Sequence, residues 1–335
     1  MDLHFSFIVP VYNRPEEIRE LLGSMALQTY SQPFEVVIIE DGSIQSSETV
    51  VAEFREHLNL SYYAKSNSGP GSSRNYGMER ANGNYFIILD SDCILPESYL
   101  DKVNDSLQNQ FVPCFGGPDA AHPSFNPLQK AIDYTMTSIW TTGGIRGRKK
   151  GVGKFQPRSF NMGISKEAFE ATDGFGSIHP GEDPDLTFRL WKKGYDTKLI
   201  PEANVYHRRR LNWNKFFTQV YKFGMARPIL NKWHPDTSRI TYWFPAFFCI
   251  GLLASLVLLV FGIFWGMLLY AAYFLLIFMD SLRKYGNVLT AFYSLLAVCT
   301  QFFGYGYGFL KSSFWLTFSN RRPRELFPEL FFKTN

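Results

Sequence analysis

Short apolar runs alternate with amphipathic stretches along the first two hundred residues. Strand-like runs occupy 5–11, 34–40, 59–64 and 84–89. Helical patterns lie between them, at 15–27, 46–57 and 71–81. Short apolar runs bounded by turn residues are typical of buried strands, and their alternation with helices favours a mostly parallel sheet covered on both faces. The pattern therefore predicts an α/β domain over residues 1–210.

A long stretch without charge follows. Residues 242–279 carry no charged side chain, and these 38 residues would form about 57 Å of helix at 1.5 Å per residue. Because a hydrocarbon core is about 30 Å thick, this length predicts two spans joined near Gly262–Gly266. We place them at about 242–261 and 265–282, and a third apolar segment at about 287–310 is also long enough to cross.

The lysines and arginines predict an orientation. Residues 208–239 hold eight of them against one acid, Asp236, so this side is expected to be cytoplasmic. A two-span hairpin returns Arg283 and Lys284 to the same side. A third full span would place the arginines at 321–324 outside, which conflicts with the positive-inside rule. The third segment is therefore either a span or a re-entrant or interfacial helix, and 319–335 form a tail.

The stretch 211–239 has the pattern of a surface helix. Its apolar positions 213, 216, 217, 220 and 224 follow helical spacing, and Lys215 and Lys222 lie mostly on the other side. This pattern predicts a basic amphipathic helix at the membrane surface. A helix packed on the α/β domain is the alternative.

Composition narrows the class of protein. The chain of 335 residues is 46% hydrophobic with a net charge of +4, too mild a charge to indicate a nucleic-acid partner. No two of the four cysteines form a C-x-x-C pair, so we expect reduced thiols in a cytosolic domain. The N-terminus lacks the basic region and the apolar run of a signal peptide, and its pattern predicts a strand.

Acidic residues gather where the predicted strands end. Glu40 and Asp41 close the second strand, and Asp90 and Asp92 follow the fourth. Ligands of such sheets bind beyond the carboxyl ends of the strands. Carboxylates held together raise one another's pKa, and a divalent cation or hydrogen-bond donors would relieve the repulsion. Oxygen-only ligands suit Mg²⁺ or Mn²⁺. A strand-end turn capped by aspartate is the alternative.

The segment "NSGPGSSRN" has the glycines of a phosphate-binding loop. Gly69 and Gly71 with Arg74 could cradle phosphate at a helix N-terminus. The third glycine of a dinucleotide site is missing, which disfavours an oxidoreductase. A helix cap with a surface arginine is the alternative.

Several motifs together resemble family 2 glycosyltransferases of the GT-A fold. The first 210 residues carry them in order: "VPVYNRPE", "EDGS", "GPGSSRNYGMERANGNYFIILDSD", "GEDPDLTFRLWKKGY" and "IPEANVYH". After residue 140, "RSFNMG" and "QVYKFGMARPILNKWHP" resemble the membrane-associated branch that builds bacterial exopolysaccharide. The resemblance implies a Rossmann-like GT-A domain followed by a helical membrane region, at the inner membrane of a bacterium.

The resemblance also implies a donor site. Asp92 would bind Mg²⁺ or Mn²⁺, with Asp90 sharing the metal or the ribose, and His207 would contact metal or phosphate. The metal would bridge the diphosphate of a nucleotide-sugar, expected to be a UDP-sugar. The residues matched to nucleotide binding are Pro10, Tyr12, Asn13, Asp41, Arg74, Asn75 and Asp90. The family commonly has Asp where this chain has Glu40.

The catalytic base implied by the resemblance is Asp183, which would take the proton of the acceptor hydroxyl in an inverting displacement. Glu182 would orient substrate, and Asp185 reads as a helix N-terminal acid. The residues matched to the acceptor side are Arg158, Asn161, Gln219 and Lys222. Processive synthases carry Q-x-x-R-W on the last helix, whereas this chain reads Lys222-Phe223, which favours addition of a single sugar.

The sequence thus predicts a membrane-attached, metal-dependent glycosyltransferase that adds one sugar to a polyprenyl-diphosphate-linked glycan. Two enzyme alternatives stay open: a polyprenyl-phosphate glycosyltransferase and a processive synthase. The non-enzyme alternative is a nucleotide-sugar-binding scaffold of an assembly complex.

Overall fold

The chain divides into two compact units. The computed structural model describes residues 2–120, 125–142, 154–207 and 212–332. The first unit comprises Met1–His122, Lys149–Arg208 and Phe331–Asn335, and the second comprises Pro123–Arg148 and Arg209–Leu330. This division differs in two places from a single boundary at residue 210, which stays a prediction. A segment from the middle of the α/β region clusters with the C-terminal helices, and the end of the chain clusters with the α/β unit.

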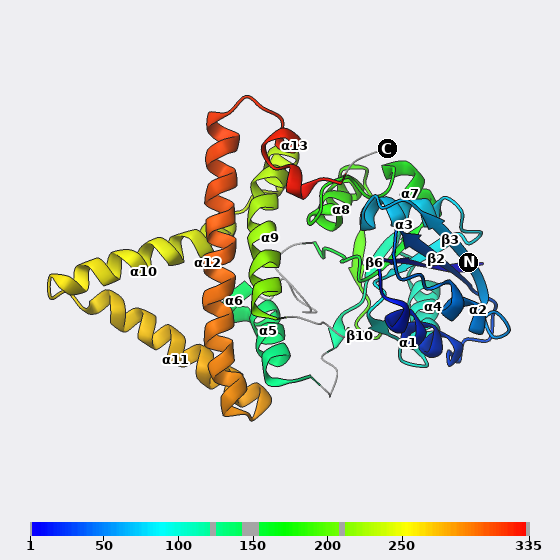
Figure 1. Cartoon of the computed structure of the whole chain (residues 1–335), viewed down its shortest axis with the longest axis horizontal. Coiled ribbons are helices and arrows are strands. Elements are labelled where there is room, and N and C mark those ends of the chain that lie inside the picture. Colours follow the sequence, from blue (N-terminus) through cyan, green and yellow to red (C-terminus); the bar gives the residue numbers. More distant parts are fainter. Residues whose placement is uncertain (1, 121–124, 143–153, 208–211, 333–335) are drawn as a thin grey trace. The chain divides into compact units, whose positions relative to one another are not determined.

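A seven-stranded sheet forms the centre of the first unit (Figure 1), in the order β3-β2-β1-β4-β8-β6-β9. Its strands are β1 (Phe5–Val11), β2 (Glu35–Asp41), β3 (Asn59–Lys65), β4 (Tyr85–Leu89), β6 (Cys114–Gly116), β8 (Asn161–Ser165) and β9 (Thr197–Leu199). Strands β1 to β4 run parallel, and β8 alone is antiparallel to its neighbours β4 and β6. The mostly parallel sheet predicted from the sequence is confirmed.

Helices cover both faces of this sheet because its strands are apolar on both sides. In β1, Phe7 and Val9 join one core cluster while Ile8 joins the other, as the alternation of strand side chains requires. The first cluster includes side chains of α1 (Pro15–Ala26), α2 (Glu48–Glu53) and α4 (Tyr99–Asn109). The second includes side chains of α3 (Pro70–Met78), α7 (Lys166–Thr172) and α8 (Glu182–Lys192).

A small three-stranded sheet stands beside the end of β4. Its central strand β10 (Val205–His207) pairs antiparallel with β5 (Cys93–Ile94) and parallel with β7 (Asp119–Ala120). Because β5 begins one residue after Asp92, this pairing fixes the chain just beyond the two strand-end aspartates.

The second unit is helical. Its α-helices are α5 (Pro127–Thr137), α6 (Ile139–Thr142), α9 (Trp213–Trp233), α10 (Phe244–Val260), α11 (Trp265–Tyr285), α12 (Val288–Phe318) and α13 (Pro323–Leu326), with 3₁₀ turns at Pro235–Thr237, Ile240–Trp243 and Pro328–Leu330. Three segments are long and apolar enough to cross a membrane: Ile240–Val260, Trp265–Tyr285 and Val288–Phe318. These are the three apolar segments that the sequence indicates.

Helix α5 belongs with the C-terminal helices through specific contacts. The Tyr134 hydroxyl donates to Asp280 at 2.7 Å, and the Tyr285 hydroxyl donates to Asp133 at 2.8 Å. Ile132 and Met136 pack in a cluster with residues of α9 and α12. An 11-residue amphipathic helix has the same sequence pattern whichever unit it packs on, so the sequence could not assign it.

Candidate active site

Two aspartates follow a fully buried strand. All five residues of β4 are buried, and the chain turns tightly after Leu89, where the Cys93 amide donates to the Asp90 carbonyl at 3.2 Å. The side chain of Asp90 is 34% exposed and that of Asp92 is 14% exposed. The rigid strand and the short turn therefore hold two carboxylates at the surface, at the carboxyl edge of the parallel strands.

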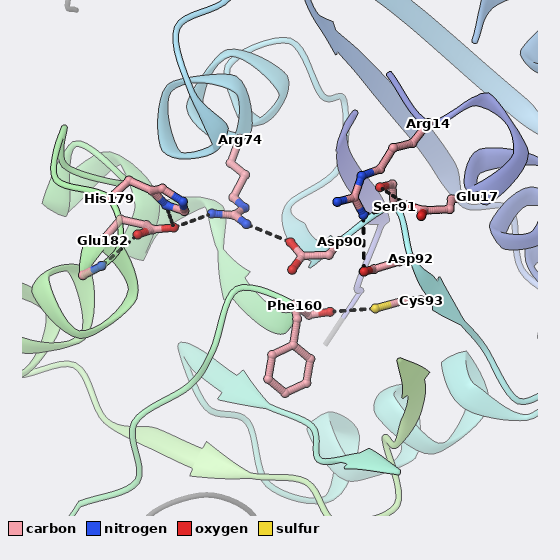
Figure 2. A network of polar contacts seen from close by, with 11 residues as sticks. Arg14, Glu17, Arg74, Asp90, Ser91, Asp92, Cys93, Phe160, His179 and Glu182 are labelled. Atoms are coloured by element: carbon pink, nitrogen blue, oxygen red, sulfur yellow. Dashed lines mark hydrogen bonds and ion pairs between the residues drawn. The ribbon is translucent and has the colours of Figure 1, made fainter. Parts of the chain in front are cut away.

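Each of these aspartates has its own arginine (Figure 2). Arg74 donates to the Asp90 carboxylate at 2.8 Å, and Arg14 reaches the Asp92 carboxylate at 3.4 Å. The two guanidinium groups offset the like-charge repulsion within the Asp90–Asp92 pair. The sequence did not indicate Arg14 as a site residue, because it directly precedes helix α1, where an arginine is usually at the surface.

Arg74 connects the strand end to helix α8. Its side chain is only 4% exposed, and a second nitrogen donates to Glu182 at 3.2 Å. The guanidinium also lies over the ring of Phe175, 5.3 Å from the centroid. One buried cation therefore brings together Asp90 and Glu182, two predicted site residues that are 92 positions apart in the chain.

The Glu182 carboxylate is held by three partners, of which Arg74 is one. His179 Nδ1 lies 2.9 Å from its carboxylate, and the Gly181 amide donates to its other oxygen at 3.0 Å. Burial acts to raise the pKa of Glu182, but the charges of His179 and Arg74 and these hydrogen bonds outweigh it and lower the pKa to about 2. Glu182 is thus a permanent anion at neutral pH. Burial acts to lower the pKa of His179, and the neighbouring Glu182 reverses this and raises it.

Asp183 has a different environment one residue along. Burial and then the charge of Glu182 raise its pKa, against the opposing charges of Arg74 and Arg158 and a hydrogen bond from Ser159. Its Oδ1 is buried and has no hydrogen-bond partner among the described residues. Buried polar atoms are nearly always bonded, so an unpartnered oxygen on an acid with a raised pKa marks a candidate proton acceptor.

The ends of β1 and β2 hold the predicted nucleotide-binding residues. Asp41 accepts from Lys65 Nζ at 2.5 Å and from the amides of Ser68 and Gly69 at 2.9 Å each. Asn13, with a left-handed φ of 54°, accepts from the amides of Ile44 and Gln45 at 2.7 and 2.9 Å. These side chains shape the two loops at this edge of the sheet.

Pro10 and Tyr12 lie beside Asn13 at the end of β1, and Tyr12 is 51% exposed. The base contacts of Pro10, Tyr12, Asn13 and Asp41 stay predictions. Glu40 holds the loop after β2, accepting from the Ser47 amide at 2.7 Å, which gives this departure from the family pattern a structural role.

Two predicted residues have structural partners for their amides. Asn75 bonds the backbone of Phe175 in both directions, at 2.8 and 2.9 Å, and so fixes the loop before α8. Asn161 is fully buried, accepting from the Tyr99 hydroxyl at 2.6 Å and donating to the Ala203 carbonyl at 2.7 Å. The acceptor role of Asn161 stays a prediction: its side chain bonds within the core, and its backbone amide donates to the Arg158 carbonyl at 3.0 Å.

The remaining predicted residues lie elsewhere or have undescribed side chains. The backbone of His207 pairs with Cys93 in the small sheet, directly after Asp92. Gln219 and Lys222 lie on α9 in the second unit. Among the described side chains, no three of His, Cys, Asp or Glu gather as a metal-binding group. The two partly exposed carboxylates, Asp90 and Asp92, nevertheless supply the oxygen donors that Mg²⁺ and Mn²⁺ prefer.

A comparison with known protein families identifies the family of the α/β domain. The model of "Glycosyl transferase family 2" matches residues 6–171. These residues form a family 2 glycosyltransferase domain. The match runs from β1 through α7 and includes Asp41, Arg74, Asp90 and Asp92, so the network around Arg74 begins inside the family 2 domain and extends beyond it to Glu182.

Relatives of the domain carry related names. An uncharacterized glycosyltransferase of Rickettsia conorii is 36% identical over 137 residues, which are 40% of this chain and 21% of that protein. The poly(ribitol-phosphate) beta-N-acetylglucosaminyltransferase TarS of Staphylococcus aureus is 39% identical over 93 residues, 27% of this chain and 16% of that protein. The chain thus spans about a fifth or less of the length of these two relatives.

A solved structure extends the likeness in fold. The mannosyltransferase PcManGT from Pyrobaculum calidifontis, in complex with GDP-Man and Mn²⁺, aligns with a TM-score of 0.63 at 17% identity. The alignment covers 90% of this chain and 88% of that one. The α/β unit of this chain therefore has the GT-A fold expected from the sequence.

Proposed function

We propose that the chain transfers a single sugar from a nucleotide-sugar to a lipid-linked acceptor, with inversion at the anomeric carbon. The observation that carries the proposal is the buried Oδ1 of Asp183, which has no partner in the described part of the chain and is held beside the Arg74 network that ends at Asp90. This arrangement begins in the family 2 domain and extends beyond it, and it offers a proton acceptor and a charged strand end that suits a diphosphate with its cation.

The donor would bind at the carboxyl edge of the sheet. Asp92 and Asp90 are suited to hold Mg²⁺ or Mn²⁺, which when bound would offset the charge of the departing diphosphate. A nucleotide-sugar is supported by the relatives' names, since TarS is a beta-N-acetylglucosaminyltransferase and PcManGT was solved with GDP-Man and Mn²⁺. Arg74 would orient Asp90, and Arg14 would orient Asp92.

Asp183 would act on the acceptor. Its Oδ1 would accept the proton of the acceptor hydroxyl, whose oxygen then forms the new bond to the anomeric carbon as the bond to the diphosphate breaks. Attack from the face opposite the leaving group inverts the configuration. The neighbouring Glu182 anion raises the pKa of Asp183 and so makes it a better proton acceptor than an exposed aspartate.

The second unit supports a lipid-linked acceptor. Three of its segments are long and apolar enough to cross a membrane. Gln219 and Lys222 lie on the basic helix α9, directly before these segments, where the phosphates of a polyprenyl-diphosphate glycan would meet positive charge. We place the family 2 domain on the cytoplasmic side of a bacterial inner membrane.

A donor screen followed by product analysis tests the proposal. The full chain in nanodiscs is offered a panel of UDP- and GDP-sugars with Mn²⁺, and binding is followed as a shift in thermal unfolding. The donor that binds is then supplied with bacterial lipid extract. We expect a glycolipid product whose anomeric configuration, read by NMR, is opposite to that of the donor. Donor binding without turnover on any lipid would support the scaffold alternative, and a retained configuration would exclude direct displacement.

A further inference from the structure

The end of the chain is fixed to the α/β unit. The backbone of Phe331 forms an antiparallel bridge with Ile178, and the Phe332 amide donates to the Ser177 carbonyl at 3.4 Å. The Phe332 ring lies against Gly69, where a Cβ would come within 2.2 Å of it, and 5.7 Å from the ring of His179. Phe331 and Phe332 therefore belong to the same body as strands β1 to β4.

This attachment limits the number of membrane crossings. The chain leaves the α/β unit near residue 208 and returns to it at Phe331. Among the described residues, the helices that could cross all lie between 240 and 318. A chain that starts and ends on one side of a membrane must cross an even number of times. Three crossings are therefore inconsistent with the attachment, and one candidate span stays on the side of the α/β unit.

Helix α12 is the one that packs along a charged helix. Figure 1 shows α9 and α12 side by side, and Gly304 and Gly308 of α12 lie against Val220 and Met225 of α9. The ring of Trp213 lies 6.0 Å from that of Tyr293, and Lys311 Nζ lies 2.9 Å from the Tyr221 hydroxyl. The α9 residues in these contacts run from Trp213 to Met225, so α12 accompanies α9 over about 18 Å of helix at 1.5 Å per residue.

The charges of helix α9 disfavour its insertion into the hydrocarbon core of a membrane. Its four basic residues are spread over its length, at Lys215, Lys222, Arg227 and Lys232. Each lysine or arginine at the centre of a membrane helix costs about 2.5–3.5 kcal/mol on insertion scales. Since α12 packs beside α9, it lies at the same depth. Helices α10 and α11, in contrast, carry no charge from Phe244 to Met279 and have the lengths of single spans.

The two faces of α12 fit a helix lying flat on the lipid. The residues of its exposed stripe recur at intervals of four and seven, which places them on one face: Phe292, Leu296, Phe303, Tyr307, Phe314 and Phe318. The opposite face is buried, and at Gly308 a Cβ would come within 2.3 Å of the Tyr221 carbonyl oxygen. Helix α12 therefore has a tightly packed inner face and an aromatic outer face, as helices bound at a bilayer surface do.

We propose that only α10 and α11 cross the membrane, and that α12 lies along its cytoplasmic surface with the aromatic stripe on the lipid. Two crossings place the basic residues before α10, those at the end of α11 and those at 321–324 on one side, as the positive-inside rule requires. The proposal does not depend on the transferase activity.

Cysteine labelling tests the topology directly. In a background with Cys249→Ala and Cys299→Ala, the remaining Cys93 and Cys114 are 1% and 0% exposed. Single reporters are then introduced as Ile263→Cys at the hairpin turn, Asn320→Cys after α12 and Asn109→Cys in the α/β unit. We expect a membrane-impermeant maleimide to label only Ile263→Cys in intact spheroplasts, and to label the other two after lysis. Labelling of Asn320→Cys in intact cells, or protection of Ile263→Cys there, would overturn the proposal.

A depth measurement tests the surface position of α12. Nitroxide labels at Phe292→Cys, Phe303→Cys and Phe314→Cys sample the stripe along the helix, with Leu256→Cys on α10 as a control for depth. We expect the three stripe labels to report one shallow depth by power saturation and the control label to report a greater one. A maximum of depth at Phe303→Cys, with shallow values on either side, would show a spanning α12 and contradict the proposal.

Discussion

The guanidinium of Arg74 donates to the Asp90 carboxylate at 2.8 Å while its own side chain is 4% exposed. We predict that Arg74→Met leaves Asp90 and Glu182 without their common partner and destabilises the α/β unit by about 3–5 kcal/mol, as expected when one member of a buried ion pair is removed. The free energy of unfolding in urea measures this effect. Arg55→Met is the control, because Arg55 is exposed and its loss should cost under about 1 kcal/mol. Equal losses in both variants would contradict the role of Arg74.

Burial, and after it the charge of the Glu182 carboxylate, raises the pKa of Asp183. Asp183 must be a carboxylate to accept a proton, so kcat/KM falls as the pH drops through its raised pKa. Glu182→Gln removes the neighbouring negative charge, and the pKa of Asp183 should fall. We therefore predict that the acid limb of the pH–rate profile moves to lower pH. Glu167→Gln, at an exposed site on α7, should leave the limb in place. An unchanged or upward limb in Glu182→Gln would contradict the coupling.

Asp92 is predicted to carry the metal dependence of donor binding. Wild-type protein should bind the donor more weakly in EDTA than in Mn²⁺. Asp92→Asn should bind it weakly in both, with a loss of at least about tenfold, since even outer-shell changes at metal sites cost that much. Calorimetric titration of the donor measures both values. Asp105→Asn, on the exposed side of α4, serves as the control. Full Mn²⁺ dependence in Asp92→Asn would place the metal elsewhere.

Asp41 is predicted to stabilise the loop that leads into α3. Asp41→Ala would leave the amides of Ser68 and Gly69 unpaired and Lys65 without its counter-charge, at a cost of about 2–4 kcal/mol. Asp41→Asn keeps one acceptor oxygen and should cost less. Unfolding midpoints of the two variants, measured beside their donor affinities, separate this structural role from a contact with the base. If Asp41→Ala is as stable as wild type, the loop does not need the carboxylate.

Strand positions and the strand-end acids were predictable from the sequence because both follow from local pattern. The run Tyr85–Leu89 is apolar at every position, so its strand and the placement of Asp90 just beyond it required no knowledge of the rest of the fold. The alternation of strands with helices was likewise sufficient to predict a mostly parallel sheet.

Other features depend on contacts between distant parts of the chain. Asn161 matched an acceptor position, and no pattern in the sequence indicated that its side chain bonds Tyr99 and Ala203, which lie 62 and 42 residues away. Arg14 gave no local signal because its partner Asp92 lies far away in the sequence and becomes a neighbour only in the folded chain. His179 gave none because it meets Glu182 only through the turn that begins α8. The return of Phe331 to Ile178 was also invisible, because no pattern in a short tail specifies which surface it meets.

The rate of sugar transfer by Asp183→Asn tests the central claim most directly. The substitution keeps the shape of the side chain and removes its capacity to accept a proton, and Asp196→Asn at an exposed site is the control. Single-turnover transfer and donor binding are measured on the same preparations. We predict that Asp183→Asn lowers the transfer rate by about 10²–10⁴-fold while the donor Kd stays at the wild-type value. Transfer at the wild-type rate in Asp183→Asn would contradict the account.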